Sequence, residues 1–464
     1  MMNYLIKYGI FAICILLSSS CKKSFLDAKP TSAILTPKTL NDLQGLLEND
    51  VELTKSTPAL SQMASDDYIF TSYENWLSTN TPTERNSYLW AKDIYEGTKL
   101  IRDWSSGYSG IFYCNNVLEV LSTIEQTPSN TAQYQMIKGW ALFMRAYLLY
   151  DLVRNFSPTY DSATAAQDLG VPVPLKPEVD VLLGRASVQD TYQQILSDLA
   201  KATRALEPTR PVNSNRPGRA AAYALGARIY LSMRLYKEAE GYADSALTIS
   251  SKLIDYNTIS KTALNPFEIN NDETIFSTGA ILADYTIITP TSANTRVTVN
   301  PELVNLYDPN DLRLTIFFRL NATTGNLYVR RGYFLQSTPY TGLATDEMYL
   351  IKAECLARRN LIPESLDWLN RLLINRFITG SFKPVRGLSQ DAALQRILTE
   401  RRKELVWRTL RWTDLKRLNK EGANITLTRS LNGVTYTLAP NDLRYVFPIP
   451  DDEIALSGIQ QNPR

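Results

Sequence analysis

The sequence predicts a mainly α-helical protein, built from paired helices and interrupted by one irregular insertion. Three observations support this fold class. Apolar residues recur with helical spacing over residues 133–156, and two later stretches, 219–250 and 346–377, each hold two such patterns separated by a short break. Residues 251–345, by contrast, lack a helical period. We therefore expect an all-α scaffold that carries a large loop-rich segment with short β pieces.

The first residues predict export and a lipid anchor. Residues 1–7 contain one lysine and no acid, residues 10–17 are apolar without a break, and three serines precede Cys21. This pattern is typical of a lipoprotein signal peptide, and the apolar run is far shorter than the ~20 residues that span a bilayer. We expect a signal peptide at 1–20, lipid on Cys21 and a tether at 21–39. The alternative is an ordinary secretory signal that happens to contain Cys21, and either signal takes the chain out of the cytoplasm.

The composition excludes most partners and most catalytic chemistries. The 49 basic and 47 acidic residues leave a net charge of +2, which is too small to attract nucleic acid. The chain has no histidine, which removes Ser-His-Asp and Cys-His catalysis and histidine-bound zinc. Phosphate-loop, dinucleotide and nucleophile-elbow motifs are missing, and Cys114 and Cys355 show no metal or disulfide spacing. We expect a protein without cofactor, metal or enzyme activity.

Two long helices come first in the folded part. Residues 133–156 combine two adjoining apolar stripes that end before Pro158, so this helix should pack on more than one side. Ser187 is a suitable N-cap for a second helix at 187–206, which ends before Pro208.

Two helical hairpins follow, at 219–250 and 346–377. Within the first, one tyrosine and three alanines at 236–246 resemble the second helix of a tetratricopeptide repeat, and Gly226 lies near the small position of the first helix. Because alanine and glycine let helices approach closely, we expect a tight helix contact at Ala243. The second hairpin repeats the design with other side chains, which indicates a degenerate array of paired helices.

The insertion at 251–345 is dominated by Asn, Asp, Pro, Gly and Thr. Loops carried on a rigid scaffold are where binding groups usually lie, so the insertion is an expected part of a site. We expect residues 40–464 to form a single domain. Short β-like pieces are predicted at 274–276, 315–320 and 327–330, and again in the tail from residue 425.

The order of motifs along the chain resembles the SusD/RagB family of outer-membrane lipoproteins of Bacteroidota. The resemblance spans nearly the whole chain after Cys21, and although each motif is weak alone, their order behind a lipidation signal is specific. The motifs are Phe-Leu-Asp at 25–27, Arg-Ala-Tyr at 145–147, Leu-Val-Arg at 152–154, Gly-Val-Pro-Val-Pro at 170–174, Tyr-Leu-Ile-Lys-Ala-Glu at 349–354, Glu-Arg-Arg-Lys-Glu-Leu at 400–405, Arg-Trp-Thr-Asp-Leu-Lys-Arg at 411–417, Phe-Pro-Ile-Pro at 447–450 and Gln-Asn-Pro at 461–463.

This resemblance implies a SusD-like α/α superhelix with tetratricopeptide-like hairpins. It also implies a non-catalytic, lipid-anchored protein of the outer membrane, exposed at the cell surface, that binds oligosaccharide or polysaccharide. Such a protein works beside a SusC-like TonB-dependent transporter. The resemblance does not name the sugar, because the family builds its ligand site from variable loops.

The carboxyl-terminal motifs are expected to be structural. Arg401, Glu404, Arg411 and Asp414 can pair across a buried helix junction, as charges inside a core require. One departure from the family pattern lies between them, where Arg408 and Thr409 replace the usual Glu-Gly. We expect a different ion pair at that position.

The candidate ligand-binding residues lie in two aperiodic stretches, 66–76 and 328–340. Tyr73 and Trp76 are predicted stacking platforms for sugar rings, beside Asp67, which would orient hydroxyl groups. Facing rings are expected from Tyr333 and Tyr340. The remaining tryptophans are expected to be structural, because they lie in helix-like surroundings or in the family's packing motifs: Trp90, Trp104, Trp140, Trp368, Trp407 and Trp412.

Two other functions remain open at this point. One is a scaffold or peptide-binding lipoprotein that gates the transporter, a use to which helical repeats are well suited. The other is a surface glycoside hydrolase, for which the pairs Asp66-Asp67 and Asp451-Asp452 are the obvious carboxylates. Because catalytic carboxylates must flank a bond ~5–9.5 Å apart and sequence neighbours point apart, loop acids or helix caps are the favoured interpretation of both pairs.

Overall fold

The computed structural model describes residues 37–281, 285–289 and 295–464 of the chain. Residues 40–464 form one compact unit. The predicted signal peptide, Cys21 and nearly all of the predicted tether lie outside the described residues. Among the helices that are described, none combines the length and the hydrophobicity needed to cross a membrane.

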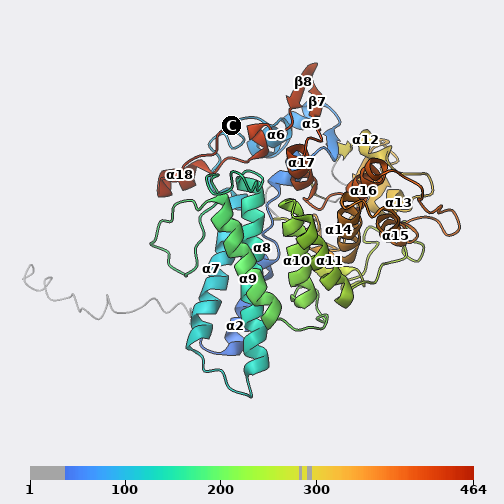
Figure 1. The fold of residues 1–464 in the computed structure, drawn as a ribbon. Coiled ribbons are helices and arrows are strands. Elements are labelled where there is room, and N and C mark those ends of the chain that lie inside the picture. Colours follow the sequence, from blue (N-terminus) through green and yellow to red (C-terminus); the bar gives the residue numbers. More distant parts are fainter. Residues whose placement is uncertain (1–36, 282–284, 290–294) are drawn as a thin grey trace, which may run out of the picture. The chain divides into compact units, whose positions relative to one another are not determined.

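Long helices that follow one another in the chain pack side by side, as the hairpin pattern predicts. In Figure 1, α7, α8 and α9 form one bundle, and α14, α15 and α16 lie together on the other side of α10 and α11. The scaffold is therefore a row of paired helices. Their bounds are α7 Arg102–Thr123, α8 Thr131–Phe156, α9 Val188–Ala205, α10 Arg219–Ser232, α11 Tyr236–Ile249, α14 Thr345–Arg358, α15 Ile362–Leu373 and α16 Gln390–Glu404.

The first two predicted helices are confirmed. In α8 every residue from Gly139 to Phe156 is buried, which is the double-sided packing that its two apolar stripes predict. The Oγ atom of Ser187 accepts a hydrogen bond from the backbone N–H of Asp190 and so caps α9 as expected.

The close contact between α10 and α11 is also confirmed. Ala239, Ala243 and Ala246 are completely buried, and α11 packs against both α10 and α14. At Gly226 a Cβ atom would lie 2.3 Å from Cδ1 of Tyr242, so only glycine fits without a shift of that ring. Small residues therefore set the distance between these two helices.

Short helices and antiparallel strand pairs surround this array: Figure 1 places α5, α6, β7 and β8 at one end and α2 near the other. The predicted β pieces at 274–276 and 327–330 are strands, whereas 315–317 is helical and only 318–320 is extended. The strand pairs are β1 Tyr68–Phe70 with β3 Val297–Val299, β2 Thr274–Phe276 with β6 Leu343–Ala344, β4 Phe318–Leu320 with β5 Leu327–Val329, and β7 Leu427–Leu431 with β8 Val434–Leu438. The short helices are α2 Leu40–Leu47, α3 Asp50–Leu53, α4 Leu60–Ala64, α5 Tyr73–Leu77, α6 Pro82–Tyr88, α12 Pro301–Val304, α13 Arg313–Phe317, α17 Arg411–Lys420, the 3-10 turn Leu443–Tyr445 and α18 Asp451–Ser457.

The carboxyl-terminal charges are buried and paired, as predicted, although their partners differ in part. Arg401 binds Asp414 at 2.9 Å, which is the expected pair. Glu404 instead binds two arginines from outside the motif, and Arg411 binds Asp66 at 2.8 Å. A buried charge that lost its partner would be costly, so these pairs fix the packing of α16 and α17.

Residues 408 and 409, which depart from the family pattern, form contacts of their own in the structure. Arg408 forms two hydrogen bonds with Asp346, at 2.9 and 2.6 Å, which is the distinct ion pair expected there. Thr409 has φ +58°, a left-handed conformation that glycine adopts freely and a β-branched residue adopts at a cost. Its carbonyl and hydroxyl oxygens both accept hydrogen bonds from Arg154, which holds this conformation in place.

Candidate ligand-binding site

Tyr73 and Trp76 lie on a short helix at the surface of the molecule. The prediction that residues 66–76 lack regular structure is wrong, because β1 pairs with β3 and α5 follows directly. Ser72 accounts for the start of α5, since its side chain accepts a hydrogen bond from the backbone N–H of Asn75. The helix is also tied to the insertion, because the Thr71 hydroxyl donates to the carbonyl oxygen of Arg296 at 3.0 Å.

The two rings form a stacked pair. Their centroids lie 5.5 Å apart with an interplanar angle of 20°, and both side chains are half-buried. The indole N–H of Trp76 donates to the carbonyl oxygen of Arg85 at 3.2 Å, which fixes the orientation of the indole. Such a pair presents a flat, rigid and partly solvated aromatic surface, which suits the apolar face of a sugar ring.

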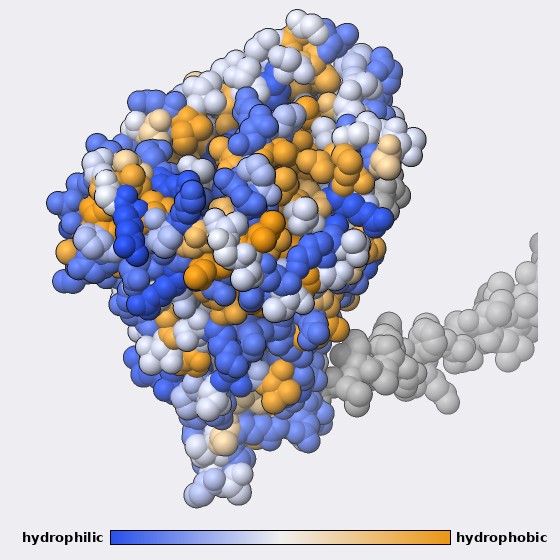
Figure 2. Space-filling model, turned by 90° about the vertical axis from the view of Figure 1, so that its right-hand side faces the viewer, coloured by the Kyte–Doolittle hydropathy of each residue, from blue (hydrophilic) through white to orange (hydrophobic). Residues whose placement is uncertain are grey.

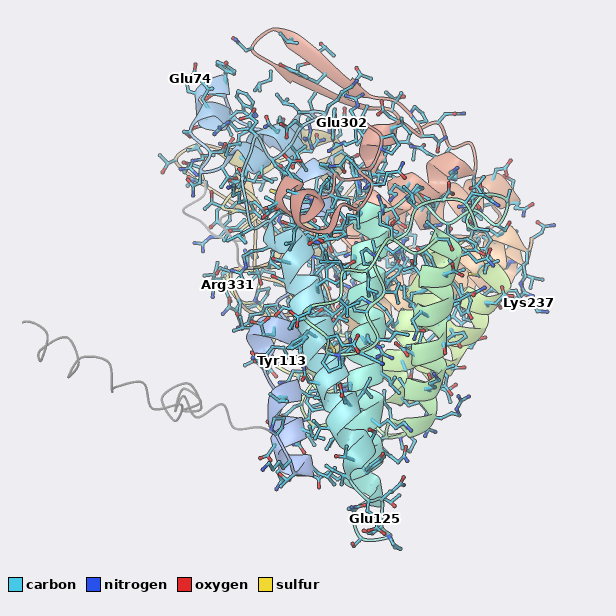
Figure 3. The ribbon with its side chains drawn as sticks, turned by 90° about the vertical axis from the view of Figure 1, so that its left-hand side faces the viewer. Glu74, Tyr113, Glu125, Lys237, Glu302 and Arg331 are labelled. Carbon is cyan, nitrogen blue, oxygen red and sulfur yellow. The ribbon has the colours of Figure 1, made fainter. Side chains whose placement is uncertain are left out.

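Polar groups surround this aromatic pair. The Asn75 side-chain amide donates to the Thr71 hydroxyl at 2.7 Å and lies beside Trp76 in sequence. Glu74 is fully exposed, and hydrogen bonds from its own backbone N–H and from Ser72 lower the pKa of its carboxyl group. Figure 3 shows Glu74 projecting from the outer edge of the molecule. The helix therefore offers both stacking surface and hydrogen-bonding groups to a polyhydroxylated ligand.

Asp67 is not part of this open surface, and the expectation that it orients a ligand is corrected. Its side chain is 1% exposed and accepts a hydrogen bond from Gln62 Nε2 at 3.0 Å. Burial, together with the charge of Asp66, raises the pKa of Asp67. Asp67 contributes to the core beneath β1, where its backbone oxygen also binds the N–H of Asn300 at 2.8 Å.

Tyr333 and Tyr340 are likewise buried, with 5% and 3% of their surfaces exposed, so the expectation of open ring faces there is also corrected. The Tyr333 hydroxyl donates to Glu273 at 2.5 Å, and the Tyr340 hydroxyl donates to the carbonyl oxygen of Leu343 at 2.8 Å. The guanidinium of Arg408 lies over both rings, at 4.8 and 5.4 Å from their centroids. Their ring faces are occupied by protein groups.

The expected structural role of the other tryptophans is confirmed for five of them, which are buried, while Trp368 is half-buried between Lys352 and Arg371. Trp104 nevertheless borders a groove of about 290 Å³ that the sequence did not predict. The groove's other walls include exposed aliphatic residues of the 172–183 loop. Tyr108, Phe112, Asn115 and Glu453 also line the groove, so polar and apolar groups both contribute to its walls. A clue was present in the apolar run at 181–183, which no helical or strand pattern accounts for.

The carboxylate pairs considered for hydrolysis lie in two different settings. Asp66 is held by Arg402 and Arg411; burial opposes ionisation of its carboxyl group, but these two cations lower its pKa well below the ordinary value. Asp451 and Asp452 lie in the first turn of α18, where carboxylates favour the helix dipole. The second pair therefore lies in the first turn of a helix rather than at its N-cap, which is Pro450, and the first pair is buried, with Asp66 in ion pairs.

Three buried carboxylates, Glu273, Asp346 and Glu404, lie close enough together to suggest a cation site. Each of them already binds arginine: Arg376 contacts Glu273 and Glu404 at 2.8 Å, and Arg408 contacts Asp346. Burial raises the pKa of Glu273 to about 7 despite Arg376. These arginines make the three carboxylates part of a buried ion network.

Two segments of the chain match models of known protein families. Residues 24–231 match a family model described as starch-binding and associating with the outer membrane, and residues 343–464 match the model of the SusD family. No curated protein shows significant similarity to the chain.

Solved structures agree over nearly the whole chain. A SusD superfamily protein from Bacteroides thetaiotaomicron has a TM-score of 0.75 at 23% identity, covering 92% of this chain and 100% of its own. A second one from Bacteroides vulgatus gives 0.74 at 21% identity, with 92% and 99% covered. A SusD-like carbohydrate binding protein from Bacteroides vulgatus gives 0.66 at 19% identity, with 91% and 97% covered. With its helical hairpins and both family models matched in order, the chain belongs to the SusD/RagB family.

Proposed function

We propose that this protein is a non-catalytic glycan-binding lipoprotein of the cell surface. It captures oligosaccharide and delivers it to a SusC-like TonB-dependent transporter in the outer membrane. The observation that carries the proposal is the stacked, half-buried pair Tyr73 and Trp76 on α5 of a SusD/RagB chain. The ligand class is supported by the matching family model, which is described as starch-binding, and by a similar structure described as a carbohydrate binding protein.

The chemistry of the ring pair suits capture and release. A sugar face stacked on Tyr73 or Trp76 gains dispersion and hydrophobic contact, while Asn75 and Glu74 supply hydrogen-bonding groups for its hydroxyls. Both rings are held by contacts within the protein, so little conformational entropy is lost when a ligand binds.

The lipid on Cys21 is the proposed anchor. Acylation of one cysteine would hold the protein at the membrane without a spanning helix, and the neutral balance of charges leaves glycan rather than nucleic acid as the partner. The transporter is the proposed recipient of the bound sugar.

A glycan panel tests the proposal directly. The mature protein is titrated with neutral and acidic oligosaccharides by calorimetry, and every mixture is then separated by chromatography to detect cleavage. We expect saturable binding of at least one glycan with no product. Sugar release beyond one equivalent would establish a hydrolase instead, and binding of peptides but of no glycan would favour a peptide-binding scaffold.

A further inference from the structure

A small cavity between the insertion and residues 404–408 is bordered by two arginines that form no ion pair with any described residue. It has a volume of about 40 Å³, and its walls include Arg330 and Arg331, which directly follow β5. A buried water needs ~10–15 Å³ on this measure, so the cavity has room for about three water-sized groups. That space matches one carboxylate or sulfate group and is too small for a sugar ring.

Arg330 is the more deeply buried of the two arginines, with 6% of its surface exposed. Its terminal nitrogens donate to the carbonyl oxygens of Ala263 and Lys261, and its Nε atom is buried without a hydrogen-bond partner. Burial and the nearby Arg319 lower the pKa of Arg330. A buried cation in this situation gains from any anion that reaches it.

Arg331 lies closer to solvent. It is half-buried, and Figure 3 places it at the edge of the molecule on the side that also carries Glu74 of α5. Within the part of the chain that the structure describes, its Nε atom is also buried without a partner, and its guanidinium makes one long hydrogen bond, 3.4 Å, to the carbonyl oxygen of Leu335. Among the described residues, neither arginine forms an ion pair.

The other charged residues that line the cavity, unlike Arg330 and Arg331, form ion pairs with described residues. Arg408 is neutralised by Asp346, and Glu404 is neutralised by two arginines. The net uncompensated charge at the cavity therefore comes from Arg330 and Arg331. The remaining wall is mainly aromatic and aliphatic, and this low-polarity lining strengthens the attraction between a guanidinium and an anion. Its aromatic members are Phe267, Phe317, Tyr333, Tyr340 and Trp407.

We propose that this cavity is a subsite for the acidic group of a glycan, a uronate carboxylate or a sulfate ester, which binds Arg330 and Arg331. The acidic group enters the cavity while its sugar ring stays at the surface. That the ligand is a glycan rests on the proposed function, whereas the anion site itself does not. The inference extends the binding surface beyond the aromatic pair on α5 and specifies an acidic ligand.

Two probes separate the two sources of the acidic group. D-galacturonate supplies a carboxylate and inorganic sulfate supplies a sulfate, and the methyl ester of galacturonate is the neutral control. Each is titrated into the mature protein by calorimetry at low ionic strength, because added salt screens a charge-based contact. We expect saturable binding of at least one anion and at least tenfold weaker binding of the ester.

The Arg331→Gln variant should weaken the anion at least tenfold, because Arg331 is half-buried and supports little of the fold. Arg204→Gln removes the same charge from the exposed last turn of α9 and is the matched control. Arg330→Gln is the second variant, with thermal unfolding measured in parallel because Arg330 also holds two backbone carbonyls. Equal binding of acid and ester, or anion binding that survives both variants, would overturn the inference.

The outcome separates this inference from the proposed function. If neutral glycans bind and neither anion does, the acidic subsite is refuted and glycan capture stands. If an anion binds through Arg331 but the glycan panel is negative, the subsite stands and glycan capture fails. Retention of anion binding in Tyr73→Ala/Trp76→Ala would support the conclusion that the cavity acts separately from the ring pair.

Discussion

Removal of the two rings on α5 is the most direct test of where glycan binds. In the variant Tyr73→Ala/Trp76→Ala the stacked surface disappears while β1, β3 and α6 remain. An aromatic contact contributes about 0.5–1.5 kcal/mol beyond the area it buries, so two rings contribute about 1–3 kcal/mol. Because 1.4 kcal/mol changes a binding constant tenfold, we expect affinity to fall roughly fivefold to 150-fold.

The structure also sets the expected effect on stability. Both rings are half-buried, and the variant loses their mutual stacking and the 3.2 Å hydrogen bond from Trp76 to the carbonyl oxygen of Arg85. Such losses cost about 1–2 kcal/mol, compared with about 3–5 kcal/mol for a tryptophan deleted from a core. In a chain of this length the melting temperature should therefore fall by only a few degrees.

Calorimetric titration with a glycan identified in the panel measures the affinity, and differential scanning calorimetry measures the melting temperature. Trp368→Ala is the matched control, because Trp368 is also half-buried but lies on α15 between Lys352 and Arg371. It should lose a similar amount of stability and keep its affinity. Undiminished affinity in the double variant would refute the placement of the site. A fall of ten degrees or more would show that the rings belong to the core.

Four further predictions concern the anchor and the scaffold. Cys21→Ala should abolish lipid labelling and release the protein from the outer membrane, and unchanged retention in fractionated cells would contradict the proposed anchor. Ala243→Leu should cost about 1–3 kcal/mol of unfolding free energy, because Ala243 is completely buried where α11 meets α10 and α14; an unchanged urea midpoint would argue against that. Arg376→Met should cost about 3–5 kcal/mol, because it removes the ion pair of buried Glu273 and one of the two arginines that bind Glu404; a stability equal to the wild type would show that the pairs are replaceable. Burial and the charge of Arg154 lower the pKa of Lys416 from 10.5 to about 7. Between pH 7 and 10.5 the unfolded chain therefore binds a proton at Lys416 that the native protein lacks, so the contribution of this residue to stability should rise with pH. In Lys416→Met the rise in unfolding free energy, measured by urea titration at several pH values, should be smaller.

Local patterns sufficed for the helical scaffold. The alanines of α11 and the stripes of α8 are visible within a few turns of sequence, and their burial follows from helical periodicity. The bounds of helix α7 were not predicted, although it has 22 residues and Trp104 was expected to lie in helix-like surroundings. Its buried face includes Asp103 and Asn115, and Gly107 and Gly110 lie where a Cβ would meet α8 side chains, so its apolar period is interrupted.

The candidate site was less accessible to sequence analysis, because burial there depends on distant partners. Tyr333 lies in a polar, aperiodic stretch, yet its hydroxyl reaches Glu273, 60 residues away in the chain. Asp67 is enclosed in the same way by Gln62 and Asn300. Without a structure, an irregular polar segment packed against the core resembles an exposed loop. Only Tyr73 and Trp76 are partly exposed, and they lie on a helix too short to show a period.

The distribution of apolar residues on the molecular surface does little to identify the ligand-binding site. Figure 2 shows apolar residues scattered among hydrophilic ones over much of one face, with a broader apolar area in its upper half. Singly exposed apolar residues are normal on a protein surface and carry no functional signal. Groups with an unusual arrangement, such as a stacked pair or an uncompensated buried arginine, are therefore the better indicators of a binding site.

The buried ion network explains how loops can serve as a binding surface in this fold. Arg376, just after α15, donates at 2.8 Å to Glu273 in the insertion, to Glu404 at the end of α16 and to the carbonyl oxygen of Ile254. One side chain thus ties the insertion to the helical array at several points. Because a buried charge without its partner is costly, these contacts resist independent movement of the insertion. Loops held in this way are ordered before a ligand arrives, so less of the binding energy is spent on ordering them.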